Sequence, residues 1–540
     1  MAFVGGLCGR LVYLHLVENQ FLKAKGNALT QRSVLLASHR GMILDRNGQA
    51  LAVSTSVKSI WLNANQINIH DKNWMRLEKL LKLPKHDLMK KIQKNPHRSF
   101  LYVKRHIDPS LAEKILDLKL AGVYAQTEYR RFYPTGEVFS QVIGHTGIDH
   151  VGQEGIELAY NAQLQGKSGT HRVLKDRTGL SVESLGKPKK PTPGEDVILS
   201  LDTRIQYLAY KELLKACAQH EAKSGSVVVL DVDTFEVLAM VSVPAHNPNI
   251  PLHTDYCRNR AVTDVFEPGS VIKPFSMVHV LAHSDYQPST MVDTTPGSMH
   301  IGNKVVKDIH NYGVLDLTQV IEKSSNVGIV QLMLALPSEH YNSFYTLLAA
   351  LGFGMISDSG FPGERAGRIL EQGKTDAFAL ATLSFGYGLT LTPLQLAQSY
   401  AILASGGMKR PVGFIKITQS DHADQLTVVD EKTAAAVKQV NKMLMTASHS
   451  KAQVAGYTVA GKTGTVRKLT SQGAHFTYSK DKHVSIFAGF APASHPKLAI
   501  AVIIDEPEVK YYGGEVCAPV FSKVMEGALR VLAVPRDIQI

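Results

Sequence analysis

Several serines of this chain stand three residues before a lysine, a spacing that can bring a lysine amine to a serine hydroxyl. A serine hydroxyl is a weak nucleophile until a neighbouring base takes its proton. Residues three apart share one face of a helix, so the helical pairs could perform acyl transfer through a covalent serine ester. Four such pairs are Ser184 with Lys187, Ser270 with Lys273, Ser448 with Lys451, and Ser479 with Lys482.

Local sequence separates these pairs. Ser184 runs into a proline-rich stretch, and Ser448 and Ser479 lie in polar stretches typical of turns and loops. Only Ser270 follows a helix-start segment, Phe266-Glu267-Pro268-Gly269, and precedes an apolar run. In the first turn its hydroxyl would lie near unpaired backbone N–H groups and the positive end of the helix dipole. That environment would stabilise an alkoxide and lower the pKa of Lys273, which must be neutral to act as the base.

Two further triplets supply the groups that acyl transfer still needs. Ser324-Ser325-Asn326 follows a predicted helix and offers a hydroxyl and a carboxamide, although Ser324 could also be a simple helix cap. Lys462-Thr463-Gly464-Thr465 lies in a strand-like run, where Lys462 could hold a carboxylate or merely be solvated. We expect the strand to align with an extended substrate and the missing side chain of Gly464 to permit that approach.

Length and composition limit the classes of protein to consider. At 540 residues, 44% hydrophobic and 20% charged, the chain should fold as two or three domains. The net charge of +12 fits either nucleic acid or an anionic cell-envelope polymer. Basic residues are spread along the chain without a zinc-finger or aromatic RNA-binding pattern, so we predict no nucleic-acid partner.

Cysteine and histidine spacing predicts no cofactor and no metal. The 22 histidines form no H-E-x-x-H motif. The four cysteines form no C-x-x-C pair, and sequence alone leaves their pairing open. They are Cys8, Cys217, Cys257 and Cys517.

The first residues are apolar except for Arg10 and His15. The run is short for a membrane span, which needs about 20 apolar residues, and no cleavage site follows it. We predict a single membrane anchor at residues 1–20, shortened relative to a complete one, with the rest of the chain on one side of the membrane. An amphipathic first helix of a soluble domain is the alternative.

Residues 30–190 predict a non-catalytic domain rich in strands. Residues 31–65 read as extended, with a hairpin around Asp45-Arg46-Asn47-Gly48. Residues 73–120 carry Leu and Lys at helical spacing, and residues 130–190 return to glycine-rich, hairpin-like sequence. The proline-rich run at 187–194 marks the predicted domain boundary.

Residues 195–535 predict one antiparallel sheet with helices on its faces, which makes the whole chain multidomain α+β. A helix capped by Asp202 and Thr203 should run to about Ala218, followed by two strands that turn at 231–234. A largely helical region to about 450 precedes three more strands and a last helix near 517–532. Two strands before and three after the insertion can form a single sheet.

The order S-x-x-K, S-x-N, K-T-G is that of penicillin-binding proteins and class A β-lactamases. Other stretches carry the resemblance across nearly the whole chain, and together they resemble a class B penicillin-binding protein. The last two of them, with G-x-E-G-I-E, are most similar to the cell-division (septal) transpeptidase. The stretches are R-G-M-I-L-D-R-N-G, R-F-Y-P-T-G-E, G-x-E-G-I-E, L-D-T-R-I-Q, F-E-P-G-S, S-F-G-Y-G-L-T-L-T-P-L-Q-L-A and Y-Y-G-G-E-V-C-A-P-V-F.

This resemblance implies a role for each motif. Ser270 would be acylated by the penultimate D-alanine of a peptidoglycan stem peptide, with Lys273 as base and Ser324 and Asn326 relaying protons and holding the substrate amide. The strand motif would bind the substrate carboxylate, and β-lactams would be trapped at the same serine. Its residues are Lys462, Thr463, Gly464 and Thr465, and the backbone N–H groups of Ser270 and Thr465 would form the oxyanion hole.

The resemblance also implies domains, location and partners. It predicts a pedestal or dimerisation-like domain before a transpeptidase domain at 195–535, held by the anchor on the outer side of the cytoplasmic membrane. No glycosyltransferase sequence precedes the pedestal, so a separate septal glycosyltransferase and other division proteins of the membrane would be partners. Arg40, Gly41, Asp45, Arg46 and Gly48 could contact a partner, but we predict that their hairpin ties the pedestal to the catalytic domain.

Three other functions remain open at this stage. An elongation-type transpeptidase would catalyse the same reaction but act in cell elongation instead of cell division. A β-lactam hydrolase would need a general base for deacylation, and no glutamate stands in a recognisable context for one. A β-lactam sensor would usually carry several membrane spans and a signalling domain.

Overall fold

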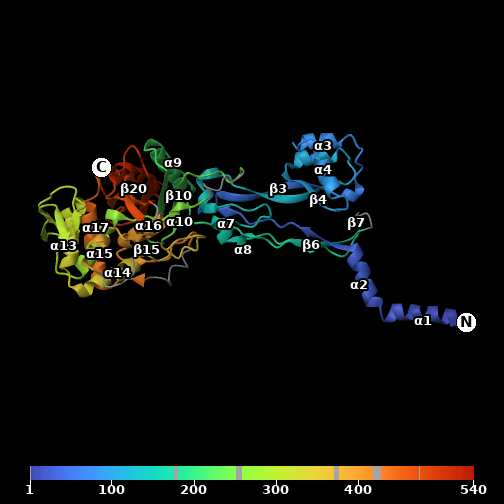
Figure 1. Ribbon diagram of the computed structural model, residues 1–540, viewed down its shortest axis with the longest axis horizontal. Helices are drawn as coiled ribbons and strands as arrows, with labels where there is room; N and C mark the ends of the chain where they lie inside the picture. Colours follow the sequence, from blue (N-terminus) through green and yellow to red (C-terminus); the bar gives the residue numbers. More distant parts are fainter. Residues whose placement is uncertain are drawn as a thin grey trace.

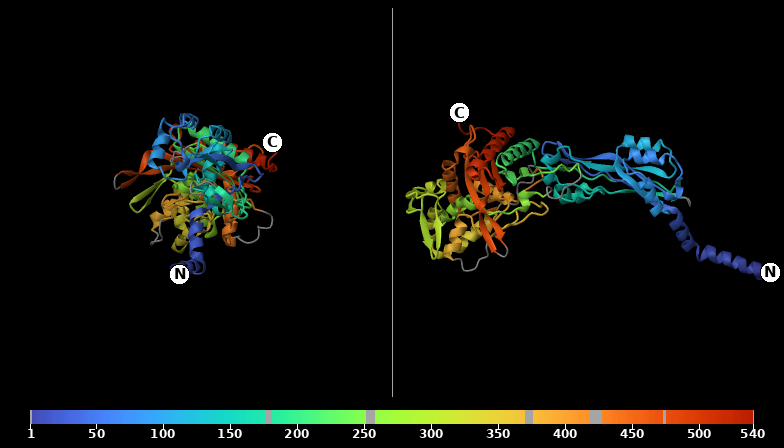
Figure 2. Two further views of the ribbon diagram at one scale, coloured as in Figure 1. Left: turned by 90° about the vertical axis from the view of Figure 1, so that its right-hand side faces the viewer. Right: turned by 45° about the horizontal axis from the view of Figure 1, so that its top comes forward.

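The computed structural model describes residues 2–175, 181–250, 258–369, 376–417, 427–472 and 475–539. The molecule is elongated (Figures 1 and 2). A helix-rich domain with a central sheet lies at the C-terminal end, long strands form the middle, and the N-terminal helices project from the opposite end (Figure 1). Catalytic and non-catalytic motifs are therefore segregated along the long axis.

The C-terminal domain is built on a five-stranded antiparallel sheet in the order β10-β9-β21-β20-β19. The two strands before the helical insertion and the three after it thus form one sheet, as predicted. The strands are β9 (Ser224–Asp231), β10 (Val237–Val243), β19 (Ala460–Gln472), β20 (His475–Ala491) and β21 (Leu498–Asp505).

Apolar residues fill both faces of this sheet because strand side chains alternate in direction. Val227 and Val229 belong to the cluster that includes residues of α9 (Thr203–Gln219) and α19 (Ala518–Val531). Val228 and Leu230 belong to the larger cluster on the other face. That face is covered by helices including α11 (Lys273–Ala282), α16 (Pro393–Ala404) and α17 (Glu431–Thr446). The sheet is therefore a central layer between two sets of helices.

The insertion between β10 and β19 is largely helical, as predicted, but it also contains short hairpins that the sequence did not indicate. Its further helices are α10 (Arg260–Thr263), α12 (Leu317–Glu322), α13 (Asn326–Ala335), α14 (Tyr341–Ala350) and α15 (Ala377–Ser384). The strand pairs are β11 (Met291–Asp293) with β14 (Val314–Asp316), β12 (Ser298–Ile301) with β13 (Lys304–Lys307), β15 (Arg368–Ile369) with β16 (Leu389–Thr390), and β17 (Met408–Lys409) with β18 (Thr427–Val428).

The N-terminal domain is organised around one long strand, β3 (Ala50–Leu62). Strands β4 and β5 both pair with its second half and therefore lie on its opposite edges, while the short strand β2 pairs with its first residues. A separate three-stranded sheet has the order β1-β6-β7. The other strands are β1 (Gln31–Leu36), β2 (Ile43–Leu44), β4 (Leu101–Ile107), β5 (Val123–Phe132), β6 (Gly169–Lys175), β7 (Ser181–Ser184) and β8 (Val197–Ile198).

The helical prediction for residues 73–120 is partly wrong. Helices α3 (Trp74–Leu80), α4 (Asp87–Lys94) and α5 (Pro109–Leu116) are present, but β4 lies between α4 and α5. Val103 and Ile107 of β4 are buried in the cluster beneath β3. Pairing with β3, which lies some forty residues away in the chain, decides the conformation here over local propensity.

The predicted hairpin at Asp45–Gly48 joins β2 to β3 and contacts the catalytic domain. Only Gly48 of the turn has a positive φ, +84°. The Asp45 carboxylate accepts from the hydroxyl and the N–H of Thr203 at the start of α9, at 2.8 and 3.2 Å. Arg46 N–H donates to the carbonyl of Leu201 at 2.9 Å. The prediction that this hairpin ties the two domains together is confirmed.

Three of the family-like stretches of the N-terminal domain meet at one buried carboxylate. Glu157 accepts from Arg40 Nε at 2.7 Å and from Arg131 Nε at 2.6 Å, and all three side chains are buried. Arg131 also donates to the carbonyl of Gly41 at 2.7 Å. Burial lowers the pKa of Arg40 although Glu157 opposes the shift. This ion cluster joins segments more than a hundred residues apart in the chain.

The proline-rich run at 187–194 packs back on the N-terminal domain. Lys189 bridges to Thr170 and Thr192 bridges to Lys167, so the run is paired and does not hang free. The hairpin predicted beside it is present as β6 and β7, while its turn at 176–180 lies outside the described residues.

The N-terminal segment forms two helices, α1 (Ala2–Leu16) and α2 (Asn19–Thr30). Fifteen residues at about 1.5 Å each extend roughly 22 Å, less than the ~30 Å of a bilayer core. In the part of the chain that the structure describes, no helix is both long and apolar enough to cross a membrane. The anchor predicted at 1–20 is therefore not confirmed.

Three of the four cysteines are free thiols. Cys8 is exposed, and Cys217 and Cys517 are buried. Cys257 lies outside the described residues.

Candidate active site

Ser270 lies in a single 3-10 turn, Gly269–Ile272, that leads directly into α11. The turn is held from two directions: Gly269 N–H donates to the carbonyl of Gly386 at 3.0 Å, and the buried Tyr400 hydroxyl donates to the carbonyl of Val271 at 3.0 Å. Gly386 has a φ of +94°, and a β-carbon there would lie 2.1 Å from the Gly269 carbonyl oxygen. The nucleophile segment is therefore fixed by close backbone contact.

Lys273 is fully buried one 3-10 turn after Ser270. Its Nζ donates to the carbonyl of Ser324 at 2.5 Å, to the hydroxyl of Ser324 at 3.2 Å and to Oδ1 of Asn326 at 2.7 Å. Burial, assisted by the charge of Lys462, holds the pKa of Lys273 well below its usual value, while Asp308 opposes the shift. An amine in this environment is poised to lose its proton, which a base requires.

The structure thus brings the S-x-x-K and S-x-N motifs together through the lysine. We expected the Lys273 amine to meet the Ser270 hydroxyl, but in the described part of the chain Ser270 has no side-chain hydrogen bond. The amine is instead bound to the S-x-N loop. Catalytic hydrogen bonds are often absent without substrate, so this geometry does not disfavour the pair.

The S-x-N loop is shaped by backbone strain and by one carboxylate. Ser324 follows α12 with a φ of +57°, a left-handed conformation that is uncommon for serine. Ser325 is the N-cap of α13, accepting from Gly328 N–H at 2.8 Å. Asp308 accepts from the Ser325 hydroxyl at 2.5 Å and from the N–H groups of Asn326 and Val327. Asp308 therefore holds the loop in place through these hydrogen bonds.

The third motif lies on β19, which is the edge strand of the central sheet. No strand in the described ranges pairs with its outer edge, which leaves that edge open for an extended ligand. Lys462 is buried, and its desolvation lowers its pKa to about 8. The Thr465 hydroxyl accepts from Gly513 N–H at 3.0 Å.

The missing side chain of Gly464 has a different structural consequence from the one we expected. A β-carbon on Gly464 would lie 3.0 Å from the carbonyl oxygen of Pro268 and 3.1 Å from Cγ1 of Val271. Both atoms belong to the segment around Ser270. The absence of a side chain therefore lets β19 pack against the nucleophile turn, whereas we predicted that it makes room for substrate.

The other S-x-x-K pairs lack this arrangement. Ser184 ends β7, before the proline-rich run. Ser448 lies in the loop after α17, and Ser479 and Lys482 lie within β20, where we expected a loop. None of these serines begins a helix.

Sequence reasoning missed three residues that shape the site. Gly386 and Tyr400 stand in or next to the S-F-G-Y-G-L-T-L-T-P-L-Q-L-A stretch, so that stretch was a usable signal. Asp308 precedes Ser324 in a separate hairpin segment, and no local pattern marks it.

Comparison with known proteins agrees with this geometry. Residues 36–199 match the penicillin-binding protein dimerisation domain, and residues 225–526 match the penicillin binding protein transpeptidase domain. The chain is 39% identical to the probable peptidoglycan D,D-transpeptidase PbpC of Pseudomonas aeruginosa, covering 98% of this chain and 93% of that protein. It is 37% identical to the peptidoglycan D,D-transpeptidase FtsI of Escherichia coli, covering 98% and 90%.

A solved structure shares the overall architecture. Penicillin binding protein 3 of Mycobacterium tuberculosis, in complex with aztreonam, is 25% identical with a TM-score of 0.69, covering 94% of this chain and 98% of that one.

A dimerisation domain, a transpeptidase domain and the serine–lysine site define a class B penicillin-binding protein, and the chain belongs to that family. Within it, the chain is a peptidoglycan D,D-transpeptidase related over nearly its whole length to the FtsI and PenA proteins.

Proposed function

We propose that this enzyme cross-links peptidoglycan stem peptides at the division septum through an acyl-enzyme on Ser270. The observation that carries the proposal is the buried Lys273 amine, which contacts Ser324 and Asn326 on one side and stands one turn from Ser270 on the other. The septal role rests on the likeness to FtsI proteins over 98% of the chain.

In the first half-reaction, neutral Lys273 takes the Ser270 proton as Oγ attacks the carbonyl of the penultimate D-alanine. The developing oxyanion would be held by the N–H groups of Ser270 and Thr465. Lys462, Thr463 and Thr465 would bind the terminal carboxylate, with Gly464 keeping β19 against the nucleophile turn. The peptide bond then breaks, and the terminal D-alanine leaves with the proton, which the Ser324 hydroxyl can relay from Lys273.

In the second half-reaction, an amine of a neighbouring stem peptide attacks the acyl-enzyme ester. The C–O bond to Ser270 breaks, a new amide bond forms, and the amine proton returns through Lys273 to the serine oxygen. A β-lactam would acylate the same hydroxyl, with its opened ring remaining attached to Ser270.

We assign residues 30–190 to a pedestal and 195–535 to the catalytic domain, with residues 1–20 as the membrane attachment. The wall polymer lies outside the cytoplasmic membrane, so the catalytic domain should work there. Side chains of α1, including Leu7, Leu11 and Leu16, are exposed and apolar, which suits burial in lipid or in a membrane partner. A septal glycosyltransferase and other division proteins are the partners we propose.

The test is labelling with fluorescent penicillin followed by mass spectrometry of the labelled peptide. We expect the label on Ser270 in the wild type and none in Ser270→Ala. Ser479→Ala, which alters another serine of the S-x-x-K spacing, is the matched control and should label normally. A label that persists in folded Ser270→Ala would refute the assignment.

Depletion of the protein in growing cells tests the septal role. Filaments are expected if it serves division, whereas round cells would assign it to elongation. A stable penicillin adduct in the first experiment would also exclude rapid β-lactam hydrolysis.

A further inference from the structure

A cavity of about 340 Å³ lies beside the nucleophile segment. Its wall includes Phe266 and Glu267, just before Ser270, and Val466 and Leu469 of β19, just after the K-T-G motif. The volume is within the range of small-molecule sites, and much of the lining is apolar. The cavity therefore lies against the part of β19 that follows Thr465, next to the segment that leads into Ser270.

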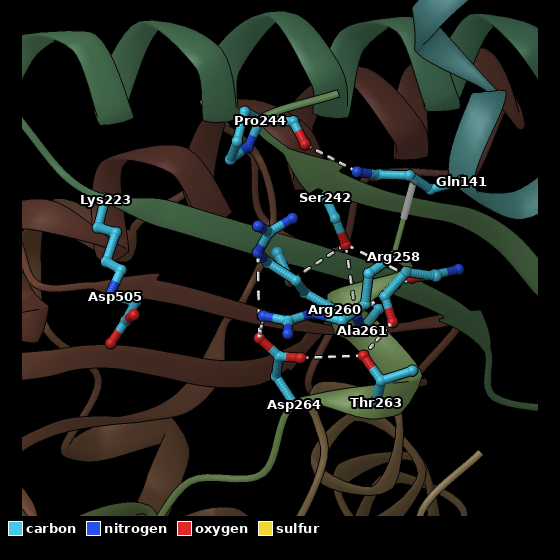
Figure 3. A network of polar contacts seen from close by, with 12 residues as sticks. Gln141, Lys223, Ser242, Pro244, Arg258, Arg260, Ala261, Thr263, Asp264 and Asp505 are labelled. Atoms are coloured by element: carbon cyan, nitrogen blue, oxygen red, sulfur yellow. Dashed lines mark hydrogen bonds and ion pairs between the residues drawn. The ribbon is translucent and has the colours of Figure 1, made fainter. Parts of the chain in front are cut away.

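Of the three carboxylates on the cavity wall, all but one are paired with a cation. Asp264 accepts from Arg258 at 2.9 Å and lies 3.9 Å from Arg260 Nε (Figure 3). Asp505 binds Lys468 at 2.7 Å. Neither of these carboxylates needs a further cation.

Glu267 is the exception. Its Oε1 accepts only from neutral donors, the N–H of Gly388 at 3.0 Å and the hydroxyl of Tyr478 at 3.1 Å. Within the described residues it has no ion-pair partner. Burial raises the pKa of the Glu267 carboxyl, as expected for an acid without a counter-ion.

Two aromatic rings stand beside this carboxylate. Tyr387 and Tyr478 pack edge to face with centroids 5.4 Å apart, and Tyr478 is hydrogen-bonded to Glu267. Burial raises the pKa of both phenols, and the negative charge of Glu267 raises it further. A carboxylate beside two tyrosine rings is a chemically suitable receptor for an ammonium group.

We propose that Glu267, with Tyr387 and Tyr478, binds a primary ammonium group carried by a stem peptide, whose aliphatic chain lies along the apolar cavity wall. This proposal rests on the proposed function. With the substrate carboxylate at Lys462 and Thr463 and the reacting carbonyl at Ser270, residues before the reacting bond lie beside Val466 and Arg467. The residue that precedes the two D-alanines is then next to the cavity.

Two stem peptides could supply the ammonium group. Cross-linking joins the carbonyl of one stem peptide to a side-chain amine of another, and both belong to the same polymer. The donor peptide therefore also carries that amine, on a residue that can reach Glu267. The acceptor peptide is the other source, with Glu267 holding its amine before attack.

The test compares thioester donors that differ at one position. Nα-acetyl-L-lysyl-D-alanyl-D-thiolactate presents the amine, and its Nε-acetylated form has the same chain without the charge. Ser270 attack breaks the C–S bond and releases a thiol, which is measured without any acceptor. We expect kcat/KM for the free-amine donor to be about tenfold higher, the size of one ion pair partly shielded from water.

Glu267→Gln should bring the ratio of the two donors close to one. Asp264→Asn, which alters a paired carboxylate of the same cavity, should keep the wild-type ratio. The same series with Nα-acetyl-L-lysine as acceptor separates the two sources, because an effect of Glu267→Gln confined to transfer assigns the ammonium to the acceptor peptide. Equal wild-type rates with both donors, together with no effect of Glu267→Gln on transfer, would overturn the proposal.

Failure of the proposed function would look different. In that case neither donor nor penicillin would acylate Ser270 in the wild type. A Glu267→Gln protein that slows both donors equally, with no specific effect on transfer, would show a structural role through Gly388 and would also overturn the proposal.

Discussion

The Lys273 amine lies 2.7 Å from Oδ1 of Asn326, while Nδ2 of the same amide donates to the carbonyl of Lys307 at 2.9 Å. The Lys307 contact fixes which end of the amide faces the lysine. A neutral amine has two N–H groups, and these can donate to the Ser324 carbonyl and to the Asn326 side-chain oxygen. Its lone pair is then available to take a proton from a hydroxyl. The loop thus stabilises the base in its active form.

Asp308→Asn should shift the acidic limb of the pH–acylation profile to lower pH. Asp308 raises the pKa of Lys273, so removing its charge lowers that pKa further. The base is neutral above its pKa, and the rate therefore begins to rise at lower pH. The measurement is the second-order rate of penicillin acylation against pH.

Asp316→Asn is the control for Asp308→Asn. Asp316 caps the neighbouring helix α12, accepting from Gln319 N–H at 2.7 Å, and contributes no shift to Lys273. Asparagine caps a helix about as well as aspartate, so this variant should leave both the helix start and the acidic limb in place. An unshifted limb in Asp308→Asn would mean that Asp308 only shapes the loop.

Lys462→Arg should remove the alkaline limb of the same profile. The pKa of Lys462 is lowered to about 8, so its charge is present below that pH and lost above it. If Lys462 binds the β-lactam carboxylate, acylation by the wild type should fall about tenfold per pH unit well above pH 8. Arginine stays charged throughout this range. Lys468→Arg changes a lysine on the same strand that is paired with Asp505, so this variant should keep the alkaline limb. Loss of the alkaline limb in Lys468→Arg would contradict the assignment.

Much of the catalytic domain was predictable because its signals are local. Asp202 caps α9, and short runs of apolar residues mark β9, β10 and β21. Strand β4 was missed because pairing with the distant β3, not its own sequence, makes it a strand. Asp308 and the true neighbour of Gly464 were missed for the same reason: both depend on contacts between segments that only the folded chain brings together.

Gly386→Ala should abolish acylation without a catalytic group being touched. Its φ of +94° disfavours alanine, and the new β-carbon would collide with the Gly269 carbonyl, displacing Ser270. Gly360→Ala is the matched control, since Gly360 has a φ of +67° and open space around it. It should lose only about 1–2 kcal/mol of stability from the backbone conformation. Thermal unfolding and penicillin labelling measure the two effects, and equal labelling of both variants would contradict the packing argument.

Glu157→Gln should destabilise the pedestal while sparing the catalytic site. The substitution removes the negative charge between the buried Arg40 and Arg131, a loss of about 3 kcal/mol for a broken buried ion cluster. Both tryptophans of the chain, Trp61 and Trp74, lie in this domain, so their fluorescence during urea unfolding reports on the pedestal alone.

Glu154→Gln supplies the comparison, because Glu154 belongs to the same G-x-E-G-I-E stretch but is about half exposed and lies 3.7 Å from His145. It should change the unfolding free energy by less than about 1 kcal/mol. Penicillin labelling of Ser270 in the full chain should stay normal in both variants before urea is added. If Glu157→Gln unfolds at the wild-type urea concentration, the three motifs that meet at this carboxylate do not depend on its charge. If it instead loses labelling in the absence of urea, the pedestal ion cluster reaches the active site, and the path to examine is the Asp45 hairpin on Thr203.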